Sequence, residues 1–348
     1  MNIRYGFRTI RNSFKTKKKT YFDIKKIYLN KNLIYEYSSN KKYSINQLIT
    51  GSIREKHRKD EKKVPKEYIY GRSPVFSALI AKNREKFYKL YIYGDDKKND
   101  DILKISTSMS IPIEFVKSKS ILDNYSLNRP HNGFVLETSP IRCISLTTRK
   151  ELLDFQINYS NDIESKISNN LYSKNDLNLW LFLDEITDPM NMGAILRNAY
   201  YFGLNGVVLS EKNSASLSPI VNKASSGACE FLKIFKTANP LSFLQLLKSN
   251  NWKVIGTTSL SDKVKNDLVI PYNELDTYLS NSPVLLIMGN EHRGMRTLVK
   301  NKCDFLVTIP PSQFTFSLID SLNVSVASGI LISELSKILR IKKYDKIL

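Results

Sequence analysis

The segment DEITDPMNMGAILRNAYYFG, residues 184–203, holds the first side chains that could do chemistry. An apolar run enters a polar turn and then a helix-forming stretch that contains Asn191, Gly193 and Arg197. An amide and a guanidinium are both strong hydrogen-bonding groups, and both can approach the end of the strand although they do not share one helical face. An ordinary capped turn, with Asn191 as the cap and Arg197 in solvent, is the alternative interpretation.

The segment MGNEHRGM, residues 288–295, places two glycines around Glu291 directly after an apolar run. Glycine at the end of a strand allows a ligand to approach the backbone closely. This pattern predicts a binding loop that contains Gly289 and Glu291, whereas a tight turn without a ligand is the simpler interpretation. His292 is a lone histidine among charges, for which we expect a surface position and no role.

The third segment runs from IPP, residues 309–311, to SLNVSVASG, residues 321–329. Ser321 can cap a final helix, and Asn323 lies beside that helix start. The small residues that follow allow another backbone or a cofactor to pack against the first turns.

The chain has no GxGxxG after a strand, no phosphate-binding lysine loop and no HExxH, which removes the main support for dinucleotide, triphosphatase and zinc-protease functions.

Alternating strands and helices are expected to position these three segments. The apolar runs LWLFLDEI, GVVLS, KVIGTTSL, PVLLIMGNE and DFLVTIP predict strands, and MGAILRNAYYFG, PIVNKASSGACEFL and the stretch from Ser321 predict helices. Such alternation predicts an α/β fold with a parallel sheet covered on both faces. Ligands bind at the carboxyl ends of the strands in such sheets, where all three segments fall.

Composition divides the chain into five segments. We predict a targeting segment over 1–22, a polar linker over 23–66, a small α/β domain over 67–141, a second linker over 142–178 and the alternating domain over 179–348. The first 22 residues contain seven basic residues and no acid, which is typical of a mitochondrial transit peptide. A basic RNA-binding arm is the alternative for this segment.

The chain carries 53 lysines and arginines against 33 acids, a formal charge of +20. A surplus of this size favours nucleic acid as the partner, although an AT-rich genome would enrich lysine as well.

The chain has three cysteines, Cys143, Cys229 and Cys303, which are odd in number and far apart, so neither disulfides nor a metal site are expected. No apolar run approaches the roughly 18 to 20 residues that cross a bilayer.

The three segments, in this order, resemble the three motifs of the SpoU/TrmH family of RNA ribose 2'-O-methyltransferases in the SPOUT superfamily, over roughly residues 179–340. NMGAILR is similar to the first motif, GNEHRGM to the second, and IPP with SLNVSVASG to the third. The stretch from YIYGRSPVFSAL to RPHNGFVLE resembles the small RNA substrate-binding domain that precedes the catalytic domain in many members. The resemblance implies a C-terminal deep trefoil knot, which general rules of chain topology would not predict.

The resemblance also implies a cofactor, a site and an assembly. S-adenosylmethionine is the implied cofactor, with no metal, and a homodimer is the implied assembly, each site being completed near the subunit interface. Arg197 is implied to bind the phosphate of the target nucleotide, and Ser321 to assist or to cap the helix. The implied binding positions are Gly289, Ile309 and Leu322, and the implied catalytic positions are Arg197, Asn191, Glu291, Ser321 and Asn323.

The substrate expected by analogy is a guanosine ribose in the peptidyl transferase region of mitochondrial large-subunit ribosomal RNA. This expectation places the protein in the mitochondrial matrix. Transfer RNA is the alternative substrate, and an RNA-binding ribosome assembly factor is the alternative of another class. One departure from the family pattern is the long spacer before Ser321, which leaves the placement of residues 311–320 open.

Overall fold

The structure is a computed structural model that describes residues 24–29, 32–37, 65–94, 100–155, 177–259, 269–280, 282–312 and 321–344. The chain divides into two compact units, residues 1–64 and 65–348. In the first unit, strand β1 (Ile24–Leu29) pairs antiparallel with β2 (Asn32–Tyr37). The segment predicted as a linker over 23–66 therefore contains two paired strands, and both are rich in the isoleucine and tyrosine that favour strands. The predicted targeting segment, residues 1–22, lies outside the described residues.

The second unit begins with a four-stranded sheet in the order β3-β6-β4-β5. Strand β6 is antiparallel to both of its neighbours, and β4 and β5 are parallel. Helices α3 and α4 contribute to the apolar core on one face, and α5 contributes to the core on the other. The elements are β3 (Glu67–Tyr70), α3 (Arg72–Ala81), β4 (Phe87–Ile92), α4 (Asp101–Ser108), β5 (Ile113–Phe115), α5 (Lys119–Ser126) and β6 (Phe134–Thr138).

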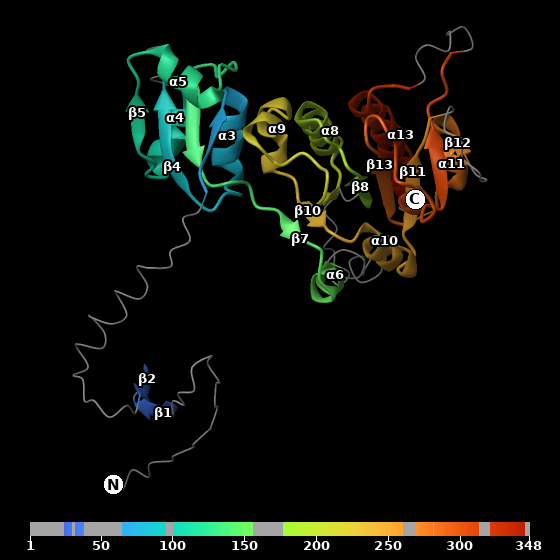
Figure 1. Cartoon of the computed structure of the whole chain (residues 1–348), viewed down its shortest axis with the longest axis horizontal. Helices are drawn as coiled ribbons and strands as arrows, with labels where there is room; N and C mark the ends of the chain where they lie inside the picture. The colour runs from blue at the N-terminus through green and yellow to red at the C-terminus, as the bar shows by residue number, and fades with distance from the viewer. Residues whose placement is uncertain are drawn as a thin grey trace. The chain divides into compact units, whose positions relative to one another are not determined.

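The rest of this unit is built on an eight-stranded, wholly parallel sheet in the order β12-β14-β11-β13-β8-β9-β10-β7. The α/β class and the parallel sheet are thus confirmed (Figure 1). Its strands are β7 (Ile144–Ser145), β8 (Leu179–Leu183), β9 (Gly206–Ser210), β10 (Ile234–Thr237), β11 (Lys253–Thr257), β12 (Val269–Pro271), β13 (Val284–Met288) and β14 (Phe305–Thr308).

Helices cover both faces of this sheet. The longer ones are α8 (Pro189–Phe202), α10 (Pro240–Ser249) and α13 (Val324–Tyr344), and the shorter ones are α6 (Arg149–Phe155), α9 (Pro219–Ala224), α11 (Leu275–Tyr278) and α12 (Thr297–Lys300), with 3-10 turns at Ala228–Glu230 and Tyr272–Glu274. Helices α8, α9 and α13 pack in one apolar core, and α6, α10 and α12 pack in the other (Figure 1).

Strand β8 shows why the sheet is buried on both sides. Its sequence LWLFL is apolar throughout and fully buried, as expected for a central parallel strand. Leu181 faces the core that contains α8, whereas Trp180 and Phe182 face the core that contains α10. The chain then turns into α8, where the Asp188 side chain accepts a hydrogen bond from the Met190 N–H and Gly203 ends the helix with a φ of 75°.

The segment predicted as a linker over 142–178 is partly structured. Strand β7 pairs with β10, and α6 buries Phe155 against the rings of Trp180 and Phe235. Strand β7 is only two residues long, so periodicity could not identify it, and its partner β10 was not predicted either. Residues 156–176 of this segment lie outside the described residues.

Three of the sheet strands end at the segments that carry the candidate residues. Asp184 follows β8, Gly289 follows β13 and Ile309 follows β14. The knot remains a prediction, and residues 313–320 of the spacer before Ser321 lie outside the described residues. None of the helices in the described part of the chain is both long and apolar enough to cross a bilayer.

Candidate active site

Two adjoining cavities open at the carboxyl ends of these strands. The larger has a volume of about 440 Å³ and the smaller about 330 Å³. Both are lined by five residues of the second and third segments, which are Glu291, His292, Ser321, Leu322 and Val324. A ligand in one cavity therefore lies next to a ligand in the other.

The larger cavity contains all three predicted cofactor positions. Gly289, Ile309 and Leu322 line it, together with Thr257 at the end of β11 and Thr258 directly after it. A Cβ atom on Gly289 would lie 2.3 Å from the Met295 nitrogen, so no other residue fits there without moving the backbone. The lining mixes aliphatic side chains with polar groups, which suits a ligand that has an apolar ring and a charged end.

The smaller cavity holds a chain of hydrogen bonds that joins the three segments. The Asn191 side chain donates to Glu291 Oε1 over 3.3 Å, and the Asn323 side chain donates to Asn191 Oδ1 over 3.1 Å. Asn323 Oδ1 in turn accepts from the N–H and the hydroxyl of Ser325, at 2.8 and 2.6 Å. Glu291 can only accept hydrogen bonds, so Asn191 must point its NH₂ group at Glu291 and its oxygen at Asn323. This fixes the orientation of both amides.

Glu291 is an anchor for the turn that follows β8. Its carboxylate accepts hydrogen bonds from the Thr187 N–H and hydroxyl and from the Asp188 N–H, at 3.2–3.3 Å. Burial raises the pKa of Glu291, but these backbone hydrogen bonds and the Asn191 amide outweigh burial and hold the pKa below its ordinary value. A carboxylate stabilised in this way is better suited to holding two loops together than to donating a proton.

Arg197 does not join this constellation. It is exposed on α8 and lines neither cavity, and no hydrogen bond or ion pair of its side chain is found within the described residues. Arg197 follows Asn191 by six positions, and this separation places the two side chains about 120° apart around a helix. Within one chain, Glu291 therefore binds the turn after β8 and Asn191, and no contact between Glu291 and Arg197 is found among the described residues.

The final helix begins later than predicted. It starts at Val324, and the hydrogen bond from the Ser325 N–H makes Asn323 the capping residue. Capping by Ser321 was therefore a wrong prediction, although Ser321 does line both cavities. His292, which was expected to have no role, is exposed but also lines both cavities.

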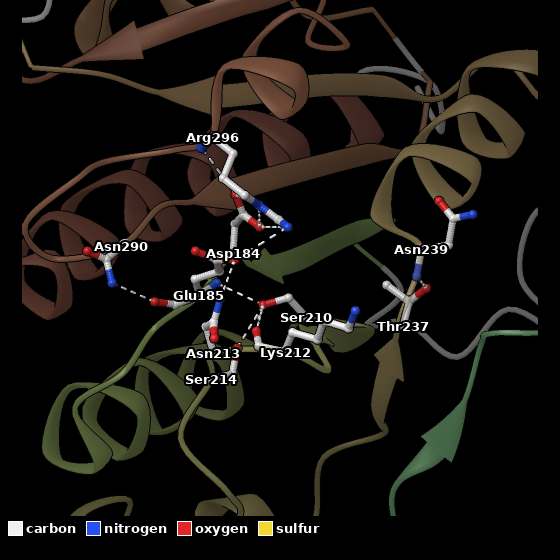
Figure 2. Close-up of polar contacts among 10 residues, drawn as sticks. All are labelled: Asp184, Glu185, Ser210, Lys212, Asn213, Ser214, Thr237, Asn239, Asn290 and Arg296. Carbon is white, nitrogen blue, oxygen red and sulfur yellow. Dashed lines mark hydrogen bonds and ion pairs between the residues drawn. The ribbon is translucent and has the colours of Figure 1, made fainter.

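An ion pair behind the loop after β13 was not predicted from the sequence. Asp184 is fully buried, and the Arg296 side chain donates Nε–H to both of its carboxylate oxygens, at 3.0 and 3.2 Å. Figure 2 shows Arg296 over Asp184, with Glu185 and Asn290 beside them. The available signal was an acid directly after a buried strand and an arginine just past a glycine-rich loop.

The same ion pair holds both ends of the loop that contains Glu291. The Asp184 N–H donates to the Met288 carbonyl at 2.9 Å, immediately before the loop, and Arg296 follows it. Within the loop, Asn290 and Gly294 form two backbone hydrogen bonds, and the Asn290 side chain donates to the Glu185 carbonyl at 2.8 Å. Asp184 and Arg296 therefore position Gly289 and Glu291 without lining the cavities themselves. No cluster of metal-ligating side chains is found in the described ranges.

Two family descriptions match the chain. "SpoU rRNA Methylase family" matches residues 178–333, and "RNA 2'-O ribose methyltransferase substrate binding" matches residues 68–142. A protein of Schizosaccharomyces pombe, "rRNA methyltransferase 1, mitochondrial", is 36% identical over 281 residues, which cover 77% of this chain and 89% of that protein. The protein of the same name from Dictyostelium discoideum is 36% identical over 255 residues, but this match spans only 46% of its length.

Solved structures share the fold. The AdoMet-bound rRNA methyltransferase from Sinorhizobium meliloti superimposes with a TM-score of 0.58, covering 85% of this chain and 97% of that one at 20% identity. The structure described as an RNA 2'-O ribose methyltransferase gives a TM-score of 0.55 at 22% identity. The α/β fold of this family is thus confirmed by similarity of both sequence and structure, and the knot stays a prediction.

Proposed function

Because the chain belongs to the SpoU rRNA methylase family, we propose that it methylates the ribose 2'-hydroxyl of a guanosine in mitochondrial large-subunit ribosomal RNA, within the peptidyl transferase region. The observation that carries this proposal is the pair of adjoining cavities joined by the Glu291–Asn191–Asn323 hydrogen bonds. One cavity takes the methyl donor and the other takes the target ribose.

The residues of the larger cavity fit S-adenosylmethionine, the cofactor of this family. Gly289 keeps the loop wall open to a close approach, and Ile309 and Leu322 supply aliphatic contacts. When bound, the cofactor supplies an electrophilic methyl group on its sulfonium. The protein holds that group next to the smaller cavity, and positioning of this kind lowers the barrier of a two-substrate reaction.

Asn191 and Asn323 orient the attacking hydroxyl. Each of these side-chain amides has two N–H groups and uses one of them within the hydrogen-bonded series, which leaves the second N–H of each to donate to the 2'-oxygen. Such donors stabilise the negative charge that builds on this oxygen as its proton leaves. Glu291 keeps the amides in this orientation.

Arg197 acts, in this proposal, in the site of a second subunit. Arg197 lies on α8 seven residues after Met190 and four before Tyr201, a spacing that places all three on one helix face. Met190 is 53% exposed and Tyr201 81% exposed, and exposed apolar side chains of this size favour a subunit interface. A homodimer through this face would bring Arg197 to the partner's cavity, where its guanidinium binds the phosphate of the target nucleotide.

Mixing two inactive variants tests this assembly. Arg197→Ala and Asn323→Ala homodimers should each be inactive, but their mixture should recover roughly a quarter of the wild-type rate, because half of the dimers contain one intact site. Both variants should still bind S-adenosylmethionine. A mixture that stays inactive after subunit exchange would show that Arg197 serves its own chain.

The substrate is tested with labelled S-adenosylmethionine. The wild-type protein and Arg197→Ala are incubated with mitochondrial ribosomal RNA or transfer RNA, and the methylated ribose is mapped. Label in a guanosine of the ribosomal RNA supports the proposal, and label in transfer RNA alone rejects it. RNA binding without label would favour an assembly factor instead.

We also place the protein in the mitochondrial matrix, as its relatives named mitochondrial suggest. Residues 1–22 serve as the transit peptide in this proposal. Their deletion should abolish import into isolated mitochondria, whereas their fusion to a reporter should direct that reporter to the matrix.

A further inference from the structure

A third cavity lies in the small domain, outside the candidate active site. It has a volume of about 540 Å³, within the range of about 300–1,000 Å³ that is usual for ligand sites. Its walls come from the residues after β4, from α5 and from the loop that leads into β6, and they share no residue with the two cavities described above. The matching family description covers this domain but assigns no residue or pocket within it.

Two cations flank the third cavity. Lys119 is exposed on the first turn of α5, and Arg129 is exposed in the loop before β6. Arg129 lies close enough to the buried Tyr70 hydroxyl to oppose the rise in the pKa of Tyr70 that burial causes. Asp123, the one acid among the described residues of the cavity wall, is 3.9 Å from Lys119, which is too long for a strong pair. An anion that enters can therefore engage both cations.

His131 fixes the loop between these cations. It is 3% exposed, and its Nδ1 accepts a hydrogen bond from the Gly133 N–H at 3.1 Å. Its Nε2–H consequently donates to Asp123 at 3.1 Å, which ties the loop to α5 and occupies the carboxylate. Asp123 is thus occupied by His131, and Lys119 and Arg129 are the charged groups that can bind a ligand.

The rest of the wall suits a nucleobase. Tyr93, 37% exposed, offers a ring, and Asn128 and Asn132 offer exposed amides. Both asparagines have a positive φ, 58° and 53°, which is uncommon outside glycine and requires the surrounding loop to hold them. Asn132 also accepts a hydrogen bond from Lys223 of α9 at 3.3 Å, so the cavity borders the larger domain.

We propose that this cavity binds one unpaired nucleotide of the RNA substrate, with its phosphates on Lys119 and Arg129 and its base stacked on Tyr93. An aromatic ring beside cations is the usual arrangement for a single-stranded base. A base within a duplex has both faces stacked and could not enter. This site recognises a nucleotide of the RNA other than the one that is methylated. The inference rests on the proposed function only because it takes RNA as the substrate.

The test uses the full chain and a fluorescein-labelled single-stranded RNA from the methylated region. Lys119→Ala/Arg129→Ala should raise the KM for RNA at least tenfold and leave the affinity for S-adenosylmethionine and kcat unchanged. The slope of log affinity against log salt should become shallower by about 0.7 for each phosphate that the variant no longer neutralises. Tyr93→Ala should weaken binding roughly tenfold with an unchanged salt slope, because stacking involves no counterion release.

The control is Lys104→Ala/Arg149→Ala, which removes the same charges from exposed positions outside the cavity. It should bind RNA nearly as well as the wild type. Equal losses in both double variants, or a duplex of the same sequence that competes as well as the single strand, would overturn the proposal. Retained S-adenosylmethionine binding shows that a variant is folded. If ribosomal RNA is bound through Tyr93 but never methylated, the proposed function fails while this site stands.

Discussion

Glu291 shows how a single side chain unites segments that are distant in the sequence. It accepts hydrogen bonds from Thr187, Asp188 and Asn191, about 100 residues earlier in the chain. Through Asn191 it also determines the orientation of Asn323 at the start of α13. The two amides that we propose to orient the target hydroxyl therefore depend on a carboxylate that need not touch the substrate.

Replacing Glu291 with glutamine tests this dependence. Glutamine has one acceptor oxygen and one NH₂ group. The NH₂ group would face N–H donors that now bind the carboxylate, and those hydrogen bonds would be lost. We expect kcat/KM to fall roughly 10- to 100-fold, as for the loss of other preorganised hydrogen bonds. The control is Glu274→Gln at an exposed position, which should leave the rate unchanged. A rate for Glu291→Gln within twofold of wild type would contradict the anchoring role.

The lowered pKa of Glu291 also predicts a pH dependence of stability. A carboxyl group with a depressed folded-state pKa stabilises the fold above its unfolded pKa of about 4.3, and that stabilisation is lost as the pH falls through the folded-state pKa. The wild type should be more stable than Glu291→Gln at pH 6. This difference in unfolding free energy should shrink as the pH falls through the folded-state pKa of Glu291. Urea titrations at several pH values measure it. A difference that grows on acidification would show that the pKa is raised instead.

At the scale of elements, the loop after β13 is held at both ends by the pair between Asp184 and Arg296. Helices α8 and α13 form the opposite wall, where the Asn198 side chain donates to the Ser325 carbonyl and the Ser328 hydroxyl, each at 3.1 Å. The small residues of SLNVSVASG serve this close packing, since a Cβ on Gly329 would lie 3.3 Å from the Asn198 amide. The candidate active site is thus a junction of the carboxyl ends of β8, β11, β13 and β14 with helices α8 and α13.

Arg296→Met should weaken cofactor binding as well as stability. It leaves the buried Asp184 carboxylate without its guanidinium, and because Arg296 is partly exposed we expect a loss of about 2–3 kcal/mol, below the full cost of breaking a buried pair. The double variant Asp184→Asn/Arg296→Met should recover most of the stability but not the affinity for S-adenosylmethionine. Calorimetric titration measures the affinity, with Arg142→Met as the control at an exposed arginine. Unchanged affinity in both variants would reduce the pair to a structural role.

At the scale of the whole molecule, a buried ion cluster joins the small sheet to the larger one. Arg84, 5% exposed, donates to Glu230 from Nε at 2.9 Å and from Nη2 at 2.6 Å. Glu67 of β3 pairs with the same guanidinium, and the Arg84 Nη1 also donates to the Ser139 carbonyl at 2.8 Å. Glu230 lies in the turn after α9, so the cluster links the part of the unit built on the four-stranded sheet to the part built on the eight-stranded sheet.

Arg84→Ala should destabilise the protein by about 3–5 kcal/mol, because it leaves the buried Glu230 and the partly buried Glu67 without a cation. Denaturant unfolding measures the loss, and Arg72→Ala, at an exposed arginine that pairs with Asp100, should cost less than about 1 kcal/mol. Equal losses for the two variants would show that the cluster does not hold the two sheets together.

The sequence by itself determined the fold class, the central strands and the three segments that line the two adjoining cavities. Strands such as LWLFL are apolar because both of their faces are buried, and that pattern is local and readable. The positions of Gly289, Ile309 and Leu322 in one cavity followed from the family motifs and agree with the structure.

Only the tertiary structure decided which side chains meet. Asp184 and Arg296 are 112 residues apart, and Asn191 and Asn323 are 132 apart, so no local pattern could pair them. The same holds for β7 and Phe155, which are ordered by burial against distant partners rather than by their own propensity. The role of Arg197 stays a prediction, because a period of 3.6 residues cannot place positions 191 and 197 on one face and Arg197 lines neither cavity of its own chain.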